Sequence, residues 1–121
     1  MKWLFLVTTV FTSPAFADAF QDGNELYGFL QTQMRIGKGG AYKTLQAAYE
    51  GGLGQGYVAG VVDAKNGAAF CVPSGLRFNQ TEEITFNYLN SHPEERHLSA
   101  WSLVVTAMSE KFPCRKVGIS K

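Results

Sequence analysis

Apolar residues recur at helical spacing soon after residue 20. Within residues 22–36, Leu26, Leu30 and Met34 follow one another every four residues, which is the spacing of one face of an α-helix. The Gly-Lys-Gly-Gly stretch at residues 37–40 ends the pattern. This predicts a first amphipathic helix.

Residues 44–64 carry two parallel stripes at helical spacing. The large apolar stripe consists of Leu45, Tyr49, Leu53, Tyr57 and Val61, and the small stripe consists of Ala48, Gly52, Gly56 and Gly60. We expect one long helix whose large stripe fills the core and whose small stripe lets a neighbouring helix approach closely. Such packing would offset the roughly 1 kcal/mol that each interior glycine costs a helix.

Turn-forming residues concentrate between residues 63 and 80 and predict a long connecting loop around Cys71. Asn79 or Thr81 is suited to cap the short helix that follows, with the acidic residues 82–83 in its first turn. Its apolar face consists of Ile84, Tyr88 and Leu89.

The sequence Ser91-His92-Pro93-Glu94 has the spacing of a capping box and predicts the start of the last helix. Its apolar stripe consists of Leu98, Trp101, Val105, Met108 and Phe112, widened by Leu103, Val104 and Ala107. Pro113 ends it. Together the four patterns predict an all-α fold, a small single-domain bundle of about four to five helices.

The N-terminus has the pattern of a cleavable secretory signal peptide. Lys2 precedes an apolar run over residues 3–11, and an Ala-Phe-Ala sequence occupies residues 15–17. The run is shorter than the roughly 20 residues that span a bilayer. We therefore expect cleavage after Ala17, export to the periplasm, and one domain over residues 18–121 without a membrane anchor.

Charge disfavours two classes of partner. Loss of Lys2 with the leader would leave ten Lys and Arg against ten Asp and Glu, and Arg115-Lys116 is the only adjacent basic pair. Surfaces that bind nucleic acid carry clustered basic residues. Nucleic acid and anionic membranes are therefore not expected as partners.

The two cysteines, Cys71 and Cys114, can pair in an oxidising compartment. Their bridge would close a loop of about 44 residues and stabilise the fold by roughly 4 kcal/mol on the chain-entropy account. A redox-active or metal-bound thiol pair is the less favoured alternative, because the C-x-x-C spacing is missing.

No motif for catalysis or metal binding is complete. His92 and His97 are the only histidines, and neither belongs to a zinc-protease motif. Residues 54–60 resemble a dinucleotide-binding loop, but a predicted helix precedes them where that fingerprint requires a strand. A G-x-S-x-G nucleophile elbow is absent. We predict a protein that is not an enzyme and needs no cofactor or metal.

The long loop carries residue types that anchor protein interfaces. Phe70 and Phe78 lie there together with Arg77, and exposed aromatic and Arg side chains often dominate binding energy. The alternative, equally weighted, is that these residues fold back onto the core beside the disulfide.

Several short motifs, in this order, make the chain resemble the Rap/Tai family of type VI secretion immunity proteins. They are Gly23-Asn24-Glu25-Leu26, Gly56-Tyr57-Val58-Ala59-Gly60-Val61-Val62-Asp63-Ala64, Cys71-Val72-Pro73, Gln80, Tyr88-Leu89, His92-Pro93-Glu94, His97, Ala100, Leu103-Val104 and Phe112-Pro113-Cys114. The resemblance implies a helical periplasmic protein, often a homodimer, that binds a peptidoglycan amidase toxin and occludes its active site. Catalytic residues then belong to the toxin, and none is carried over.

Most of the recurring residues are expected to have structural roles. Gly56 and Gly60 would make helix contacts, Tyr57 and Trp101 would lie in the core, and Pro93 would start a helix. Pro73, Tyr88 and Pro113 belong to the same structural set. Asp63 and His97 would either form a buried polar pair or lie on the surface.

Inhibitory contacts are expected on the variable loop, where a disulfide can hold a protrusion rigid. The residues in question are Lys65, Asn66, Phe70, Arg77 and Phe78. Further cysteines that many members of the family carry near Leu30 and Gly54 are both absent, which indicates a divergent member. A general periplasmic binding module and a small exported hydrolase remain alternatives.

Overall fold

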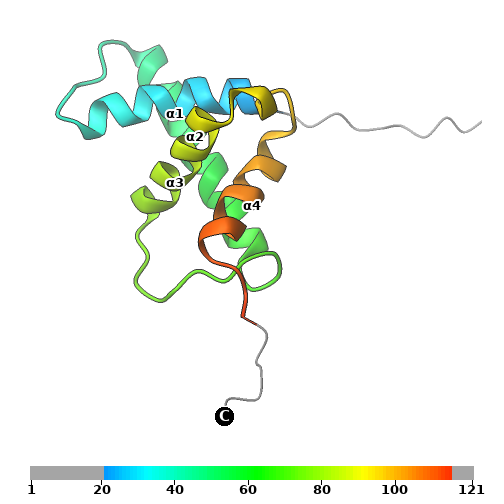
Figure 1. The fold of residues 1–121 in the computed structure, drawn as a ribbon. Coiled ribbons are helices and arrows are strands. Elements are labelled where there is room, and N and C mark those ends of the chain that lie inside the picture. Colours follow the sequence, from blue (N-terminus) through cyan, green and yellow to red (C-terminus); the bar gives the residue numbers. More distant parts are fainter. Residues whose placement is uncertain (1–20, 116–121) are drawn as a thin grey trace, which may run out of the picture.

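The computed structural model describes residues 21–115 and shows an all-helical domain with one disulfide. Its elements are α1 (Gly23–Gly37), α2 (Leu45–Lys65), α3 (Phe78–Ser91), the short 3₁₀ helix η1 (Pro93–Glu95) and α4 (Ala100–Lys111). This confirms the expected fold class. The predicted leader, residues 1–17, lies outside the described residues. Figure 1 shows α1 lying across one end of the other three α-helices.

The first helix begins as its sequence directs. The Asp22 side chain accepts a hydrogen bond from the Glu25 N–H at 2.9 Å, and Glu25 accepts one in return from the Asp22 N–H, so the first turn is capped reciprocally. Leu26 and Leu30 are fully buried. The Gly23 N–H donates to the Leu98 carbonyl, which ties the start of α1 to the segment before α4.

The second helix has the predicted extent, and Thr44 caps it through a bond from the Ala47 N–H. The predicted large stripe is wrong at its first two positions, whereas Tyr57 and Val61 of the same stripe pack partly buried against the core. Leu45 and Tyr49 of the large stripe are 91 % and 62 % exposed. The residues of α2 that are buried instead are Gly51, Gly54, Val58 and Val62.

The small stripe of α2 also faces the opposite way from expectation. A Cβ added at Gly52, Gly56 or Gly60 would meet no atom of residues 21–115 within 4 Å, whereas one at Gly54 would lie 2.8 Å from Phe29 Cβ and 3.4 Å from Leu30 Cδ2. The close approach of α1 to α2 therefore takes place at Gly54. The expectation that Gly56 and Gly60 contact a neighbouring helix is therefore wrong.

The third helix begins at Phe78, earlier than either predicted cap, and the Gln80 side chain accepts from the Arg77 N–H at 2.7 Å. Its buried stripe consists of Thr81, Glu82, Thr85, Tyr88 and Leu89. Glu82 thus lies in the second turn and in the core, so the expected first-turn charge is also wrong.

The predicted capping box at residues 91–94 does not start the last helix. Ser91 ends α3, Pro93 begins only η1, and α4 starts after Ser99. The buried face of α4 consists of Ala100, Leu103, Val104, Ala107 and Met108. Trp101 is 48 % exposed, which corrects its expected place in the core.

Candidate functional site

The connecting loop, defined here as residues 66–77, folds into two tight turns. Gly67 has a φ of 85° and donates its N–H to the Phe70 carbonyl at 2.7 Å. Gly75 has a φ of 87° and lies in the second turn. Both positions require the left-handed conformation that glycine adopts without steric cost.

Covalent and hydrogen bonds fix this loop to the C-terminal end of α4. Cys71 and Cys114 form the expected disulfide. The Cys71 N–H donates to the Phe112 carbonyl at 2.8 Å, and the Ser109 hydroxyl donates to the Ala69 carbonyl at 3.1 Å. The loop is therefore held at three points, Ser109 in α4 and Phe112 and Cys114 in the segment after it.

The two aromatic residues predicted for the loop, Phe70 and Phe78, differ in burial. Phe70 is fully buried in the core. For this residue the alternative that the loop folds back onto the core is confirmed, and the expectation that its side chain contacts a partner directly is wrong. Phe78 is 40 % exposed at the first position of α3. Phe70 therefore supports the loop from beneath, and Phe78 remains available at its rim.

A hollow of about 220 Å³ lies between α2, the connecting loop and α3, and we call it the loop hollow. Its walls are Ala59, Val62, Asp63, Asn66, Val72, Leu76, Phe78 and Thr81. The Asn66 side chain accepts from the Val72 N–H at 3.1 Å, which keeps one wall in place. Arg77 is exposed next to Phe78.

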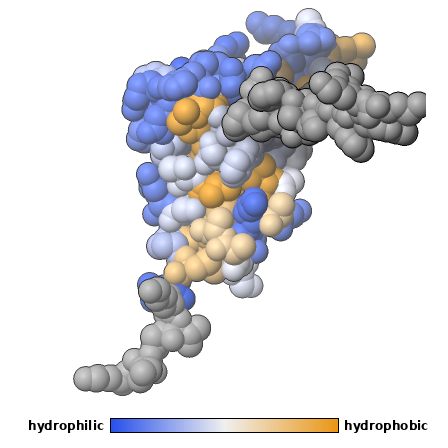
Figure 2. Space-filling view, turned by 90° about the vertical axis from the view of Figure 1, so that its right-hand side faces the viewer, coloured by the Kyte–Doolittle hydropathy of each residue, from blue (hydrophilic) through white to orange (hydrophobic). Residues whose placement is uncertain are grey.

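Lys65 belongs to a different surface. Its Nζ lies 5.8 Å from the centre of the Trp101 ring, within the range of a cation–π contact. Lys65 and Trp101 border a shallow depression of about 250 Å³ together with Gly60, Val61 and Ala64. We call these five residues the Trp101 patch. Figure 2 shows apolar surface along the α4 side of the molecule.

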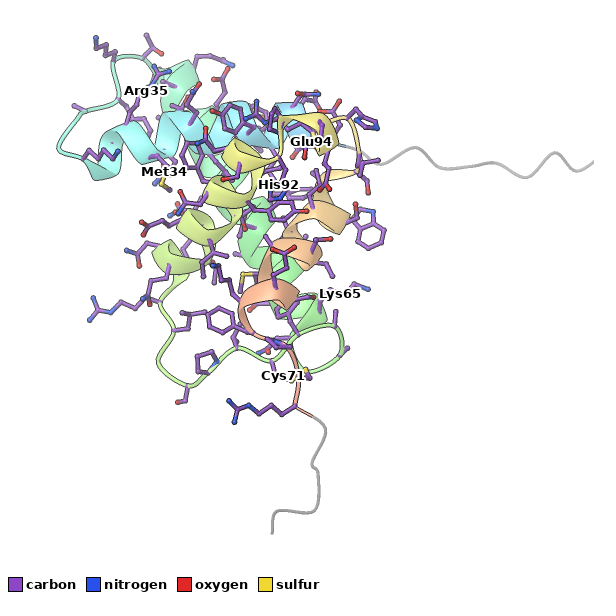
Figure 3. All side chains as sticks on the ribbon, in the orientation of Figure 1. Met34, Arg35, Lys65, Cys71, His92 and Glu94 are labelled. Carbon is purple, nitrogen blue, oxygen red and sulfur yellow. A yellow bond between two sulfur atoms is a disulfide. The ribbon has the colours of Figure 1, made fainter. Side chains whose placement is uncertain are left out.

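The predicted contact residues are thus brought to one end of the molecule but not into one site. Asn66 and Phe78 line the loop hollow, with Arg77 beside it, while Lys65 lies in the Trp101 patch. Figure 3 shows Lys65 and Cys71 at the end of the molecule opposite Arg35.

The remaining motif residues divide between the surface and the edge of the core. Asp63 and His97 are both exposed, so the surface alternative is confirmed for this pair. Tyr57 is partly buried and packs at the edge of the core. Pro73 and Pro113 are exposed and lie close in sequence to the two bridged cysteines.

Tyr88 organises the turn after α3. Its hydroxyl donates to Glu95 at 2.5 Å, and its ring stacks on His92 with the ring centres 4.1 Å apart. Burial raises the pKa of the Tyr88 phenol, and the hydrogen bond to Glu95 and that carboxylate's charge raise it further. The phenol therefore stays protonated and holds η1 against α3.

Within residues 21–115 the structure has no group of three or more His, Cys, Asp or Glu side chains placed to hold a metal ion. In the same part of the chain, every helix falls short of the length and apolar character needed to cross a membrane.

Sequence reasoning missed the burial of Glu82 and the exposure of Trp101. A signal for Glu82 was present, because the buried positions of α3 (81, 82, 85, 88 and 89) follow the spacing of a helix face. Burial of Glu82 raises the pKa of its carboxyl, and a hydrogen bond from Gln55 opposes that rise.

Comparison with known proteins adds one match. A family model described as Rap1a immunity proteins matches residues 22–114, a span that includes all four α-helices and both cysteines. A search of curated proteins found no match.

Proposed function

The chain belongs to the Rap1a immunity protein family, and from this premise we propose that it is a periplasmic inhibitor of a peptidoglycan amidase delivered by type VI secretion. The family identifies an immunity protein against a secreted effector. The family match over residues 22–114 carries the proposal. The amidase as target, and protection of the producing cell, follow from the resemblance of the sequence to Rap/Tai proteins.

Export is part of the proposal. The leader pattern of residues 1–17 and the Cys71–Cys114 disulfide both suit an oxidising compartment. Peptidoglycan lies in the same compartment, so an inhibitor there meets the toxin where the toxin acts. The mature protein would be residues 18–121.

We assign the inhibitory contacts to the rim of the loop hollow, with Asn66, Arg77 and Phe78 as the main contact residues. Phe78 and Arg77 are adjacent and exposed, and both are residue types that dominate interface energies. The disulfide and Phe70 hold the loop in place, so little ordering entropy would be lost on binding. Lys65 would contribute from the neighbouring Trp101 patch.

A second copy of the chain is the other partner in the proposal. The uncovered face of α2 suits it, because Leu45 and Tyr49 are exposed there and Gly52, Gly56 and Gly60 leave open space. Small residues let two helices approach closely across a twofold axis.

The first experiment mixes the oxidised mature domain with candidate amidases and measures complex formation and cell-wall hydrolysis. Stoichiometric binding that abolishes hydrolysis supports the proposal. If the domain binds none of the amidases and hydrolysis continues unchanged, the amidase is the wrong target. Binding to another secreted effector would then redirect the assignment within the same family.

Charge reversals locate the contact surface. Arg77→Glu and Lys65→Glu are expected to weaken amidase binding, alone and more strongly together, whereas Arg35→Glu at the opposite end of the molecule serves as the matched control. If the double variant binds as tightly as the wild type, the contact surface is neither the rim of the loop hollow nor the Trp101 patch.

Gly56→Arg tests the second copy by light scattering on a sizing column. The monomer tolerates the side chain because no described residue lies within 4 Å of that position, while the arginine would block a close helix approach. A dimer that persists in this variant would place the interface elsewhere.

A further inference from the structure

A carboxyl group in the core lacks a complete set of partners. Glu82 is only 2 % exposed, and its Oε1 has no hydrogen-bond partner among the described residues. Buried polar atoms in folded proteins are nearly always paired, and an unpaired one is costly. Within residues 21–115 this buried oxygen therefore lacks a hydrogen-bond donor.

Glu82 lines a pocket of about 290 Å³ between three helices, which we call the Glu82 pocket. Its other walls are Gln33, Met34 and Lys38 from the end of α1, Gln55 from α2, and Asn79 and Glu83 from α3. Figure 3 shows Met34 at this end of α1, close to α3 and far from Cys71. The pocket is therefore separate from both the loop hollow and the Trp101 patch.

The charges around the pocket do not balance when both acids are ionised. Two carboxyl groups, Glu82 and Glu83, face one ammonium group, Lys38, and the remaining polar walls are neutral amides. Lys38 is exposed and does not pair with Glu82 Oε1. One additional positive charge would neutralise the pocket and supply the missing donor at the same time.

We propose that the Glu82 pocket binds a single alkylammonium or guanidinium group, such as the end of a lysine or arginine side chain. Glu82 accepts a charge-assisted hydrogen bond from it, and the amides of Gln33 and Gln55 accept its remaining N–H groups. The volume is at the lower end of the range of small-molecule sites, roughly 300–1,000 Å³, and suits one side chain. This inference does not depend on the identity of the toxin.

Protonation of Glu82 opposes such binding, because a neutral carboxyl loses the charge attraction. Burial raises the pKa of this carboxyl, so a bound cation must displace a proton over part of the acidic range. The charged groups that line the pocket with Glu82 are Lys38, the residue after α1, and Glu83 from its own helix, whereas α2 contributes the neutral Gln55. Affinity for the cation is therefore expected to rise with pH.

The test titrates the oxidised mature protein with N-acetyl-arginine amide and N-acetyl-lysine amide, followed by NMR at the Met34 methyl group and the Gln55 side-chain amide. N-acetyl-citrulline amide, which has nearly the shape of the arginine probe but no charge, is the control. Saturable shifts with the two cations and not with citrulline support the proposal. No shifts, or equal shifts with citrulline, overturn it.

Three substitutions then test the assigned groups. Glu82→Gln keeps the shape and should lower the affinity for the cations at least tenfold, while Glu83→Gln should lower it less. Lys38→Gln removes the competing charge at an exposed position and should raise the affinity. The proposal is overturned if Glu82→Gln binds like the wild type or if Lys38→Gln binds more weakly, and the Lys38 variant decides the matter if the Glu82 variant does not fold.

A last comparison distinguishes the two sources of such a group. Free lysine and arginine carry a charged α-ammonium and α-carboxylate, whereas the blocked amides imitate a residue within a protein chain. Tighter binding of the blocked probes indicates a side chain of a protein partner, and tighter binding of the free amino acids indicates a small molecule. Absence of binding by all four refutes the site.

Discussion

Alanine at Gly54 and alanine at Gly56 should have opposite effects on stability, although the two positions are two residues apart on one helix. At Gly54 the new Cβ would lie 2.8 Å from Phe29 Cβ and 3.3 Å from the Phe29 carbonyl carbon. At Gly56 no atom of the described part of the chain lies within 4 Å of the new Cβ. The pair therefore separates the intrinsic preference of the helix from its packing against α1.

The magnitudes follow from two terms. Replacing an interior glycine by alanine stabilises a helix by roughly 1 kcal/mol, and this gain applies at both positions. Overpacking a tight contact costs typically about 1–3 kcal/mol. At Gly54 the cost is at the upper end, because Phe29 Cβ is attached directly to the backbone and cannot move without it. We expect Gly56→Ala to stabilise by about 1 kcal/mol and Gly54→Ala to destabilise by about 1–2 kcal/mol.

Urea unfolding of the oxidised mature domain measures both values, and thermal unfolding gives a second reading, in which 1 kcal/mol corresponds to roughly 4 °C or more for a domain of this size. Non-reducing conditions keep the disulfide constant across the series. If Gly54→Ala is as stable as Gly56→Ala, the tight contact between α1 and α2 does not exist as described.

Three further predictions concern the disulfide, the buried Glu82 and the hydrophobic core. Replacing Cys71 and Cys114 by serine should lower the free energy of unfolding by roughly 4 kcal/mol, and an unchanged urea midpoint would contradict this. Glu82→Gln should stabilise the protein at pH 7. Because burial raises the folded-state pKa of Glu82, its contribution to stability is full below the unfolded-state pKa and is lost as the pH rises through the folded-state pKa. Thermal unfolding from pH 4 to 8 should therefore show a weaker pH dependence in the variant. Leu30→Ala should lower the free energy of unfolding by about 2–5 kcal/mol because Leu30 is fully buried. Leu45→Ala, at a 91 % exposed position, should change it by less than about 0.5 kcal/mol. Equal losses in the two variants would contradict the buried face of α1 and the exposed face of α2.

Part of the candidate site could be predicted from the sequence. Turn residues, a cysteine and two aromatics identified the connecting loop, and Asn66 and Phe78 do line a hollow there. The sequence could not separate Phe70 from Phe78, because both are apolar residues in an irregular segment. Phe70 is buried because the disulfide and the Ser109 hydrogen bond draw its segment against α4.

The sequence by itself determined that the domain is helical and that its two cysteines pair. Helical spacing of apolar residues placed four helices, and the predicted extent of α2 was correct to within one residue. Helix formation depends on neighbours within a few residues. The disulfide could be predicted because each cysteine has only one other cysteine in the sequence to pair with. Local chemistry is sufficient for both.

Only the tertiary structure decided which faces are buried. α2 carries apolar or small residues on every side, so its sequence alone favours no face, and the close approach of α1 at Gly54 selects one. Tertiary packing also leaves Gly56 and Trp101 on the surface and places Glu82 in a pocket formed by three helices. Helix formation is a local property, whereas burial depends on which segments distant in sequence pack together, and spacing along one segment cannot supply that information.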